Sequence, residues 1–145
     1  MPQMPPLSEE ARKEMFSEPL VAKLATISPD GEPNISALWF EERDGSFIFN
    51  TWGTTRVAKN LKKNPKCALL IDTTDFPYAG IHYTGTAVVE GPTNDKEGMG
   101  KLFLRYKGDN LEEATEYAGQ LIEWGDRIYI RFTPEKNVAW DFSQG

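Results

Sequence analysis

Alternating hydrophobic and polar positions run through much of the chain, and this period of two predicts strands. In residues 127–133, Ile128, Ile130 and Phe132 alternate with side chains that suit the opposite face of a sheet. Apolar runs bounded by turn residues predict strands in the same way. The predicted strands are residues 20–28, 34–41, 46–52, 66–72, 80–90, 127–133 and 137–142. Because the turns at 29–31 and 43–45 are short, we expect the first three strands to form an antiparallel meander.

Helical periodicity and capping residues predict four helices, at about residues 8–18, 55–64, 94–106 and 111–123. The last two lie next to each other between strands and predict a helical hairpin. Gly85, inside the long strand 80–90, indicates a bulge that lets a sheet curve. Six to seven mainly antiparallel strands with short capping helices define a mainly β fold. Closure into a small β-barrel would remove the exposed strand edges.

The length and charge of the chain narrow the possibilities further. A chain of 145 residues with 39% hydrophobic content suits a single domain over residues 1–145, in which we expect residues 1–7 to be a flexible N-terminal arm. A net charge of −6 argues against nucleic acid or an anionic membrane as the main partner. The N-terminal residues lack an apolar signal-peptide core, and no run reaches membrane-spanning length. We therefore expect a cytoplasmic protein.

Residue types that commonly act in catalysis or metal binding are sparse. Cys67 is the single cysteine and His82 the single histidine, which excludes an intramolecular disulfide and a Cys/His zinc site. The apolar neighbours of Cys67 indicate a core position. No Ser/His/Asp set and no obvious pair of carboxylates is evident. The sequence thus predicts no catalytic side chain and no metal site.

The helix predicted at 55–64 differs from the others because it begins with cations. Arg56 and Lys59 lie in or near its first turn, whereas the other predicted helices begin with Asp or Glu. A helix N-terminus carries unpaired amides and partial positive charge, so cations there destabilise the helix and an anion stabilises it. Gly53, just before the helix, permits close approach of a ligand to the backbone. We predict a phosphate at this helix start; the alternative is a solvated basic face on a short connecting helix.

Several segments in a fixed order resemble a known family. They are the order of the elements, the Asn50-Thr51 pair followed by Arg56, the run 59–61 with Asn64-Pro65, and the closing residues 132–136 and 140–142. Over about residues 8–142, the chain resembles the FMN-binding split-barrel family related to pyridoxamine 5′-phosphate oxidase. The resemblance implies a homodimer that binds FMN, or the deazaflavin F420 in one branch, in a groove between two identical subunits.

The resemblance also implies which residues contact the cofactor. The backbone of one strand would lie along the flavin ring, Asn50 and Thr51 would follow on the next strand, and Thr55 and Arg56 would hold the phosphate. The family often has a lysine directly after that arginine, where this chain has Val57, and Lys59 lies one turn on to replace the charge. The full set of predicted cofactor-binding residues is Ser36, Ala37, Leu38, Trp39, Asn50, Thr51, Thr55, Arg56, Lys59 and His82.

The roles of the histidine and of three tryptophans keep alternatives. His82 could contact the flavin ring or bind haem iron, or it could be structural. Trp39 and Trp52 are candidates for a pocket wall, although large aromatic residues in strands are often core. We expect Trp140 to serve barrel or dimer packing.

Three functions follow from the resemblance. The first is an FMN-dependent oxidoreductase that passes hydride or electrons between a nicotinamide donor and a small, planar acceptor, with the chemistry supplied by the flavin. The second is an F420-dependent reductase, for which Lys62, Lys63 and Lys66 could extend the basic groove. The third is a non-catalytic flavin- or haem-binding protein. The C-terminal arginine and histidine segment of true pyridoxamine 5′-phosphate oxidases is not visible in residues 137–145, so vitamin B6 metabolism is not predicted.

Overall fold

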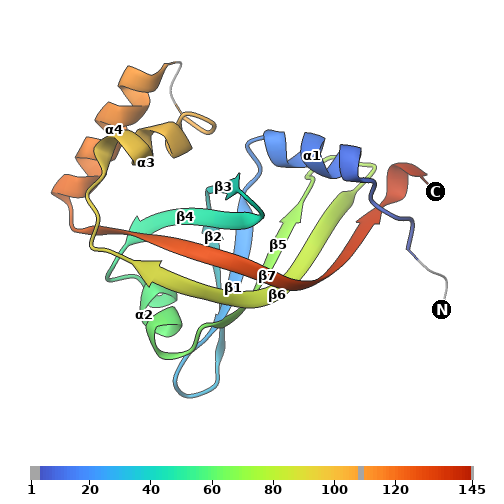
Figure 1. Ribbon diagram of the computed structural model, residues 1–145, viewed down its shortest axis with the longest axis horizontal. Coiled ribbons are helices and arrows are strands. Elements are labelled where there is room, and N and C mark those ends of the chain that lie inside the picture. The colour runs from blue at the N-terminus through green and yellow to red at the C-terminus, as the bar shows by residue number, and fades with distance from the viewer. Residues whose placement is uncertain (1–3, 108–109, 145) are drawn as a thin grey trace.

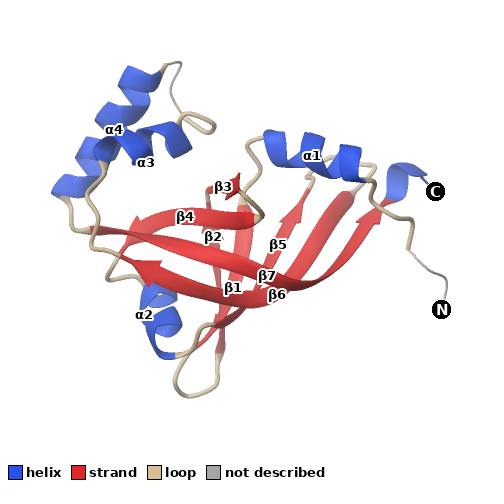
Figure 2. Ribbon diagram, viewed as in Figure 1, coloured by secondary structure: helices blue, strands red, loops and turns tan. Residues whose placement is uncertain are grey.

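The computed structural model describes residues 4–107 and 110–144. It contains one curled antiparallel sheet with helices at its ends and sides (Figures 1 and 2). In chain order the elements are α1 Glu9–Ser17, β1 Ala22–Ile27, β2 Pro33–Leu38, β3 Phe40–Arg43, β4 Ser46–Trp52, α2 Arg56–Lys63, β5 Lys66–Asp72, β6 Ala79–Glu90, α3 Lys96–Phe103, α4 Leu111–Glu123, β7 Arg127–Asp141 and the short 3₁₀ helix Phe142–Gln144.

The seven strands pair in the order β2-β1-β5-β6-β7-β4-β3, and each neighbouring pair is antiparallel. The two edge strands, β2 and β3, follow each other in the chain with only Trp39 between them. A sheet whose two edges are joined by a single residue must curl until those edges approach each other. The predicted mainly β split barrel is therefore confirmed.

The predicted meander is wrong at one point. The segment 34–41 is not one strand, because it divides at Trp39 and sends β2 and β3 to opposite edges of the sheet. The Tyr106 hydroxyl explains the break: it accepts a hydrogen bond from the Phe40 amide (3.0 Å) and donates one to the Leu20 carbonyl (2.8 Å). Since a side chain satisfies the Phe40 amide, the chain can leave one edge and begin the other without an unpaired buried group.

The two strands predicted at 127–133 and 137–142 are one continuous strand, β7. The proline inside it is tolerated because the register shifts there: Gly85 pairs with Pro134 and Thr84 with Lys136, which leaves Glu135 as the extra residue. A Cβ atom on Gly85 would lie 2.2 Å from the Thr133 carbonyl oxygen, so only glycine fits this close approach. The bulge predicted at Gly85 is confirmed.

Two hydrophobic clusters fill the structure. The first lies inside the curled sheet and includes Leu24, Phe49 and Phe132, all fully buried. The second lies between the outer face of β4 and the hairpin α3–α4, where Ile48 meets Met99. Strand β4 is thus covered on both faces, and the hairpin stands over one end of the sheet (Figure 1).

The helices mostly match their predicted ranges, and the segment before α1 contacts the end of β7. Helix α3 is shorter than predicted because Asp95 caps it at one end and the chain turns after Phe103, which frees Tyr106 to reach Phe40. The Asp141 amide donates to the Pro5 carbonyl (2.9 Å), and Leu7 packs against the core. Residues 1–3 of the predicted arm lie outside the described residues. No helix within the described residues is long and apolar enough to cross a membrane.

Candidate functional site

Helix α2 presents a basic face at its beginning. Val57, Ala58 and Leu61 are buried against the sheet, so the side chains between them project away from the core. Thr55 caps the helix: its hydroxyl accepts from the Ala58 amide (3.5 Å) and donates to the Trp52 carbonyl (2.9 Å). The first turn contains no acidic residue.

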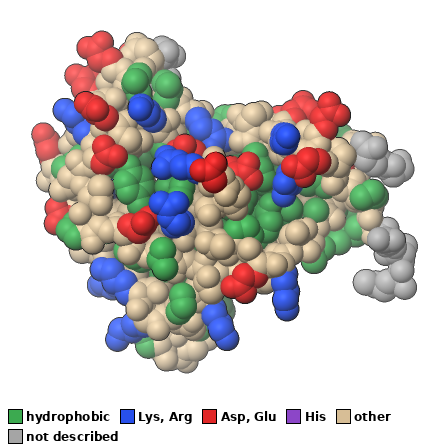
Figure 3. Space-filling view, viewed as in Figure 1, with side chains coloured by type: hydrophobic (Ala, Val, Ile, Leu, Met, Phe, Trp, Pro, Cys, Tyr) green, Lys and Arg blue, Asp and Glu red, His purple; other side chains and the backbone are tan. Residues whose placement is uncertain are grey.

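The exposed face of α2 borders a basic pocket of about 330 Å³, which we call the cationic pocket. Its lining residues are Pro29, Thr54, Arg56, Lys59, Asn60 and Lys63. No salt bridge joins its three cations to an acid among the described residues. Lys and Arg side chains lie over α2 at the lower left of Figure 3. The cationic pocket therefore brings together a helix start and three positive charges, as a phosphate site requires.

Asp30 is an acid close to this pocket. Its pKa is lowered mainly by the hydrogen bond from the Ser28 hydroxyl, then by the Glu32 amide, and to a smaller extent by the charge of Arg56. The carboxylate is thus held mainly by its own turn.

Val57, at the position where the family often has lysine, is buried and cannot reach a phosphate, whereas Lys59 lines the pocket beside Arg56.

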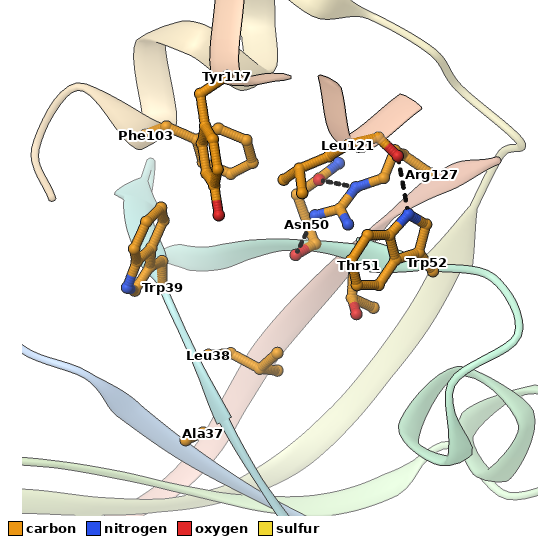
Figure 4. Close-up of a pocket in the computed structure, with 10 residues that line it drawn as sticks. All are labelled: Ala37, Leu38, Trp39, Asn50, Thr51, Trp52, Phe103, Tyr117, Leu121 and Arg127. Atoms are coloured by element: carbon orange, nitrogen blue, oxygen red, sulfur yellow. Dashed lines mark hydrogen bonds between the residues drawn. The ribbon is translucent and has the colours of Figure 1, made fainter. Parts of the chain in front are cut away.

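A second pocket of about 210 Å³ lies between β2, β4 and the α3–α4 hairpin, and we call it the aromatic pocket (Figure 4). It is lined by Ala37, Leu38, Trp39, Asn50, Thr51, Trp52, Phe103, Tyr117, Leu121 and Arg127. Four residues of the predicted strand 34–41 were expected to contact the ring, and three of them line this pocket together with the predicted pair Asn50 and Thr51. Ser36 is half-buried on β2 and is not among the lining residues.

The walls of the aromatic pocket are fixed by packing. Trp39 stacks on Tyr106 with ring centroids 4.8 Å apart and planes at 4°. The indole N–H of Trp52 donates to the Leu121 carbonyl (2.9 Å), which ties β4 to α4. Trp39 and Trp52 are pocket walls, as one of the two alternatives predicted. Trp140 instead packs closely over Gly80 on the sheet.

The short segment 52–56 contributes residues to both pockets. Trp52 lines the aromatic pocket and Arg56 the cationic pocket, and the Thr55 hydroxyl is bonded to the Trp52 carbonyl between them. One ligand with a planar ring at one end and a phosphate at the other could therefore follow this segment. Seven of the ten predicted residues line a pocket: the aromatic pocket has Ala37, Leu38, Trp39, Asn50 and Thr51, and the cationic pocket has Arg56 and Lys59. Ser36, Thr55 and His82 line neither pocket.

His82 lies apart from both pockets. It is half-buried on β6, in register with Leu70 on β5 and Val138 on β7, and it faces outward from the sheet.

Cys67 is buried, and burial raises the pKa of its thiol to about 12. Such a thiol stays protonated at neutral pH and is a poor nucleophile.

Arg127 is a pocket residue that our sequence reasoning missed. It is only 4% exposed, and its Nε atom donates to Asn50 Oδ1 (2.8 Å). One signal was available in the sequence: Phe47, Ile48 and Phe49 form an apolar run without alternation, which is typical of a strand covered on both faces. A covered β4 implies that the start of the neighbouring β7 is covered too.

Comparison with known proteins assigns the family. Residues 8–140 match the pyridoxamine 5′-phosphate oxidase family, so the chain belongs to it. A conserved hypothetical protein from Mycobacterium tuberculosis has a similar structure, with a TM-score of 0.81 and 23% identity over 99% of this chain and 92% of that one.

Two other similar structures carry functional descriptions. One is described as an F420 reductase, with a TM-score of 0.69 and 24% identity over 87% of this chain and 94% of that chain. The other is described as a heme storage protein from Vibrio cholerae, with a TM-score of 0.68 and 20% identity over 92% and 93% of the two chains. At these identities the likeness concerns the fold, and the two proteins that share it are described with different functions.

Proposed function

We propose that the protein is a flavin-dependent oxidoreductase that binds FMN with its phosphate in the cationic pocket and its ring along β2, at the edge of the aromatic pocket. The observation that carries the proposal is that one short segment, residues 52–56, contributes to both pockets. Arg56 and Lys59 would neutralise the phosphate, and the amides at the start of α2 would donate to it.

The residues present fit FMN at both ends. The ring end offers the exposed backbone face of β2 near Ala37 and the polar side chain of Thr51, while Trp39 and Trp52 exclude water. When bound, the flavin supplies hydride or electron transfer, so the reaction does not require an acid–base pair of side chains. The protein would then bind the flavin, orient it and shield it from water. We expect a nicotinamide donor and a small, planar acceptor.

A homodimer is part of the proposal, because one outer face of the sheet is apolar and open. Two register rows cross this face: Ile35, Ala25, Ala68 and Thr84 form one, and Ala37, Lys23, Leu70, His82 and Val138 form the other. Ile35 is 71% exposed and Val138 52% exposed. A face made mostly of small and apolar residues suits a second copy of the chain. In such a dimer His82 would lie inside the interface.

F420 is the second candidate cofactor. Lys63 adds a third cation to the cationic pocket, as a longer and more anionic tail would require, and one similar structure is described as an F420 reductase. Lys66 lies on a separate groove beside Cys67, so it does not extend this pocket. Haem gains less support, since His82 lines neither the aromatic nor the cationic pocket.

The test is cofactor titration with matched variants. We expect FMN to bind the purified protein and to be reduced by NADH or NADPH, whereas preference for F420 would select the second candidate and a Soret band would select haem. The Arg56→Ala, Lys59→Ala double variant should lose about 100-fold in FMN affinity with its unfolding transition unchanged, because two charge-assisted contacts are removed from an exposed face.

Lys62→Ala is the matched control, since Lys62 is an exposed lysine of α2 outside the cationic pocket. It should keep FMN affinity within about twofold of the wild-type value. Full FMN affinity in the double variant would show that the phosphate does not bind at α2.

A further inference from the structure

Arg127 is a buried cation without an acidic partner in the described part of the chain. Its side chain is 4% exposed, and none of the salt bridges among the described residues includes it. Burial lowers the pKa of its guanidinium to about 10, so it remains charged at neutral pH. The ionisable groups that act on this charge are the phenols of Tyr117 and Tyr129. A buried, uncompensated charge is costly to a folded protein unless a ligand or another group pairs with it.

The guanidinium is held in one orientation by neutral groups. Asn50 Nδ2 donates to the Ile128 carbonyl (3.1 Å), which turns Asn50 Oδ1 toward Arg127 Nε at 2.8 Å. Arg127 Nη2 makes a longer bond of 3.4 Å to the Asn50 carbonyl. The guanidinium carbon lies 4.5 Å from the ring centroid of Trp52, whose indole is itself bonded to Leu121. These contacts position the cation before any ligand arrives.

Two donors remain for a ligand in the aromatic pocket. Arg127 Nη1 and the Tyr117 hydroxyl donate no hydrogen bond to the described residues. Among those residues, every side-chain nitrogen or oxygen atom that is fully buried has a hydrogen-bond partner, so these two atoms are not fully buried. Both atoms must therefore reach the open space of the pocket. Figure 4 shows the Tyr117 hydroxyl pointing into the cavity between Trp39 and Asn50, with Arg127 on the same side as Trp52.

We propose that Arg127 and Tyr117 form a subsite for the carboxylate of a small, planar substrate that lies between the aromatic walls of the pocket. The proposal rests on the proposed function, because it names the acceptor that the flavin would serve. Figure 4 shows Ala37 and Leu38 at the opposite end of the cavity from Tyr117 and Phe103, so the β2 end is left for the cofactor ring. A volume of about 210 Å³ restricts the occupant to a small molecule.

The chain's own tryptophans provide the readout. Benzoate and benzamide have nearly the same shape, but only benzoate is an anion, so the pair measures the charge preference of the pocket. We expect titration of the wild-type protein, followed by its tryptophan fluorescence, to which Trp39 and Trp52 contribute, to show benzoate binding at least about tenfold more tightly than benzamide. Equal binding of the two probes would overturn the proposal.

Variants connect the preference to the residues. Arg127→Gln should abolish the preference for benzoate, and Arg127→Lys should restore part of it, because the charge returns without the planar fork. Arg131→Gln is the matched control: Arg131 lies on the same strand but pairs with Glu90 at the surface (3.2 Å). It should leave the preference unchanged. A preference that survives Arg127→Gln would overturn the subsite.

Arg127→Gln could disturb folding, since Arg127 also supports Asn50, and Tyr117→Phe covers that case. Loss of the hydroxyl alone should weaken benzoate binding about two- to tenfold and leave benzamide binding unchanged. No change for benzoate would count against the subsite.

Separate titrations with FMN and F420 distinguish the two proposals. If either cofactor binds but benzoate is not preferred, the subsite fails and the proposed function stands. If benzoate is preferred but neither cofactor binds, the anion subsite stands and the proposed function fails.

Discussion

Removal of one hydroxyl tests how the barrel is split. The Tyr106 hydroxyl satisfies the Phe40 amide at 3.0 Å and the Leu20 carbonyl at 2.8 Å, and Phe40 is fully buried. Tyr106→Phe keeps the ring that stacks on Trp39 but removes these two bonds and the longer one to the Phe40 carbonyl (3.2 Å). Each net hydrogen bond contributes about 1 kcal/mol, and a buried amide left unpaired costs about 1–3 kcal/mol.

We therefore expect Tyr106→Phe to lower the free energy of unfolding by about 2–4 kcal/mol, or the midpoint of thermal unfolding by roughly 4–16 °C. Urea unfolding followed by tryptophan fluorescence measures the first quantity, and calorimetry measures the second. Tyr129→Phe is the control, because the Tyr129 hydroxyl makes only a long, exposed contact to Asp95 (3.4 Å). The control should lose less than about 0.5 kcal/mol of unfolding free energy. If Tyr106→Phe also loses less than this, the hydroxyl does not maintain the break between β2 and β3.

Other predictions concern the bulge and the thiol. Gly85→Ala should lower the free energy of unfolding by more than about 2 kcal/mol in urea, because its Cβ atom would lie 2.2 Å from a backbone oxygen; Gly53→Ala, whose Cβ atom would meet Ile128 at an ordinary 3.4 Å, should cost about 1 kcal/mol or less. Cys67, with its pKa raised to about 12 by burial, should react with a thiol reagent at pH 8 far more slowly in the native protein than in denaturant. Equal rates in the two states would show that the thiol is accessible.

Local sequence signals predicted most of the elements. Strand β4 and helix α4 were predicted at their observed bounds, because turn residues or caps mark both of their ends. The break at Trp39 was not predictable, since it depends on a hydroxyl from Tyr106, 66 residues from Phe40 in the chain. The continuity of β7 through Pro134 was missed for the same kind of reason. Proline indicates an interruption locally, and only the pairing with Gly85 shows that a bulge absorbs it.

In the candidate site too, one part could be predicted from the sequence and another could not. The cationic pocket follows from a short stretch of sequence, since the start of α2 and its cations are neighbours in the chain. The back of the aromatic pocket does not, because Phe103, Tyr117 and Arg127 come from three elements that meet only after the hairpin packs on β4. Resemblance to a family identified the strand residues near the ring, but it gave no indication of the buried arginine.

The α3–α4 hairpin has a consequence for how this protein could diversify. It is inserted between β6 and β7, and it packs through its own cluster against the outer face of β4 (Figure 1). The barrel carries Ala37, Thr51 and the start of α2, whereas the insertion carries Phe103 and Tyr117. Changes in the hairpin could therefore reshape the back of the aromatic pocket without moving the cationic pocket. In such an arrangement a single barrel can keep one set of ligand contacts while exchange of one inserted segment alters which small molecules it accepts.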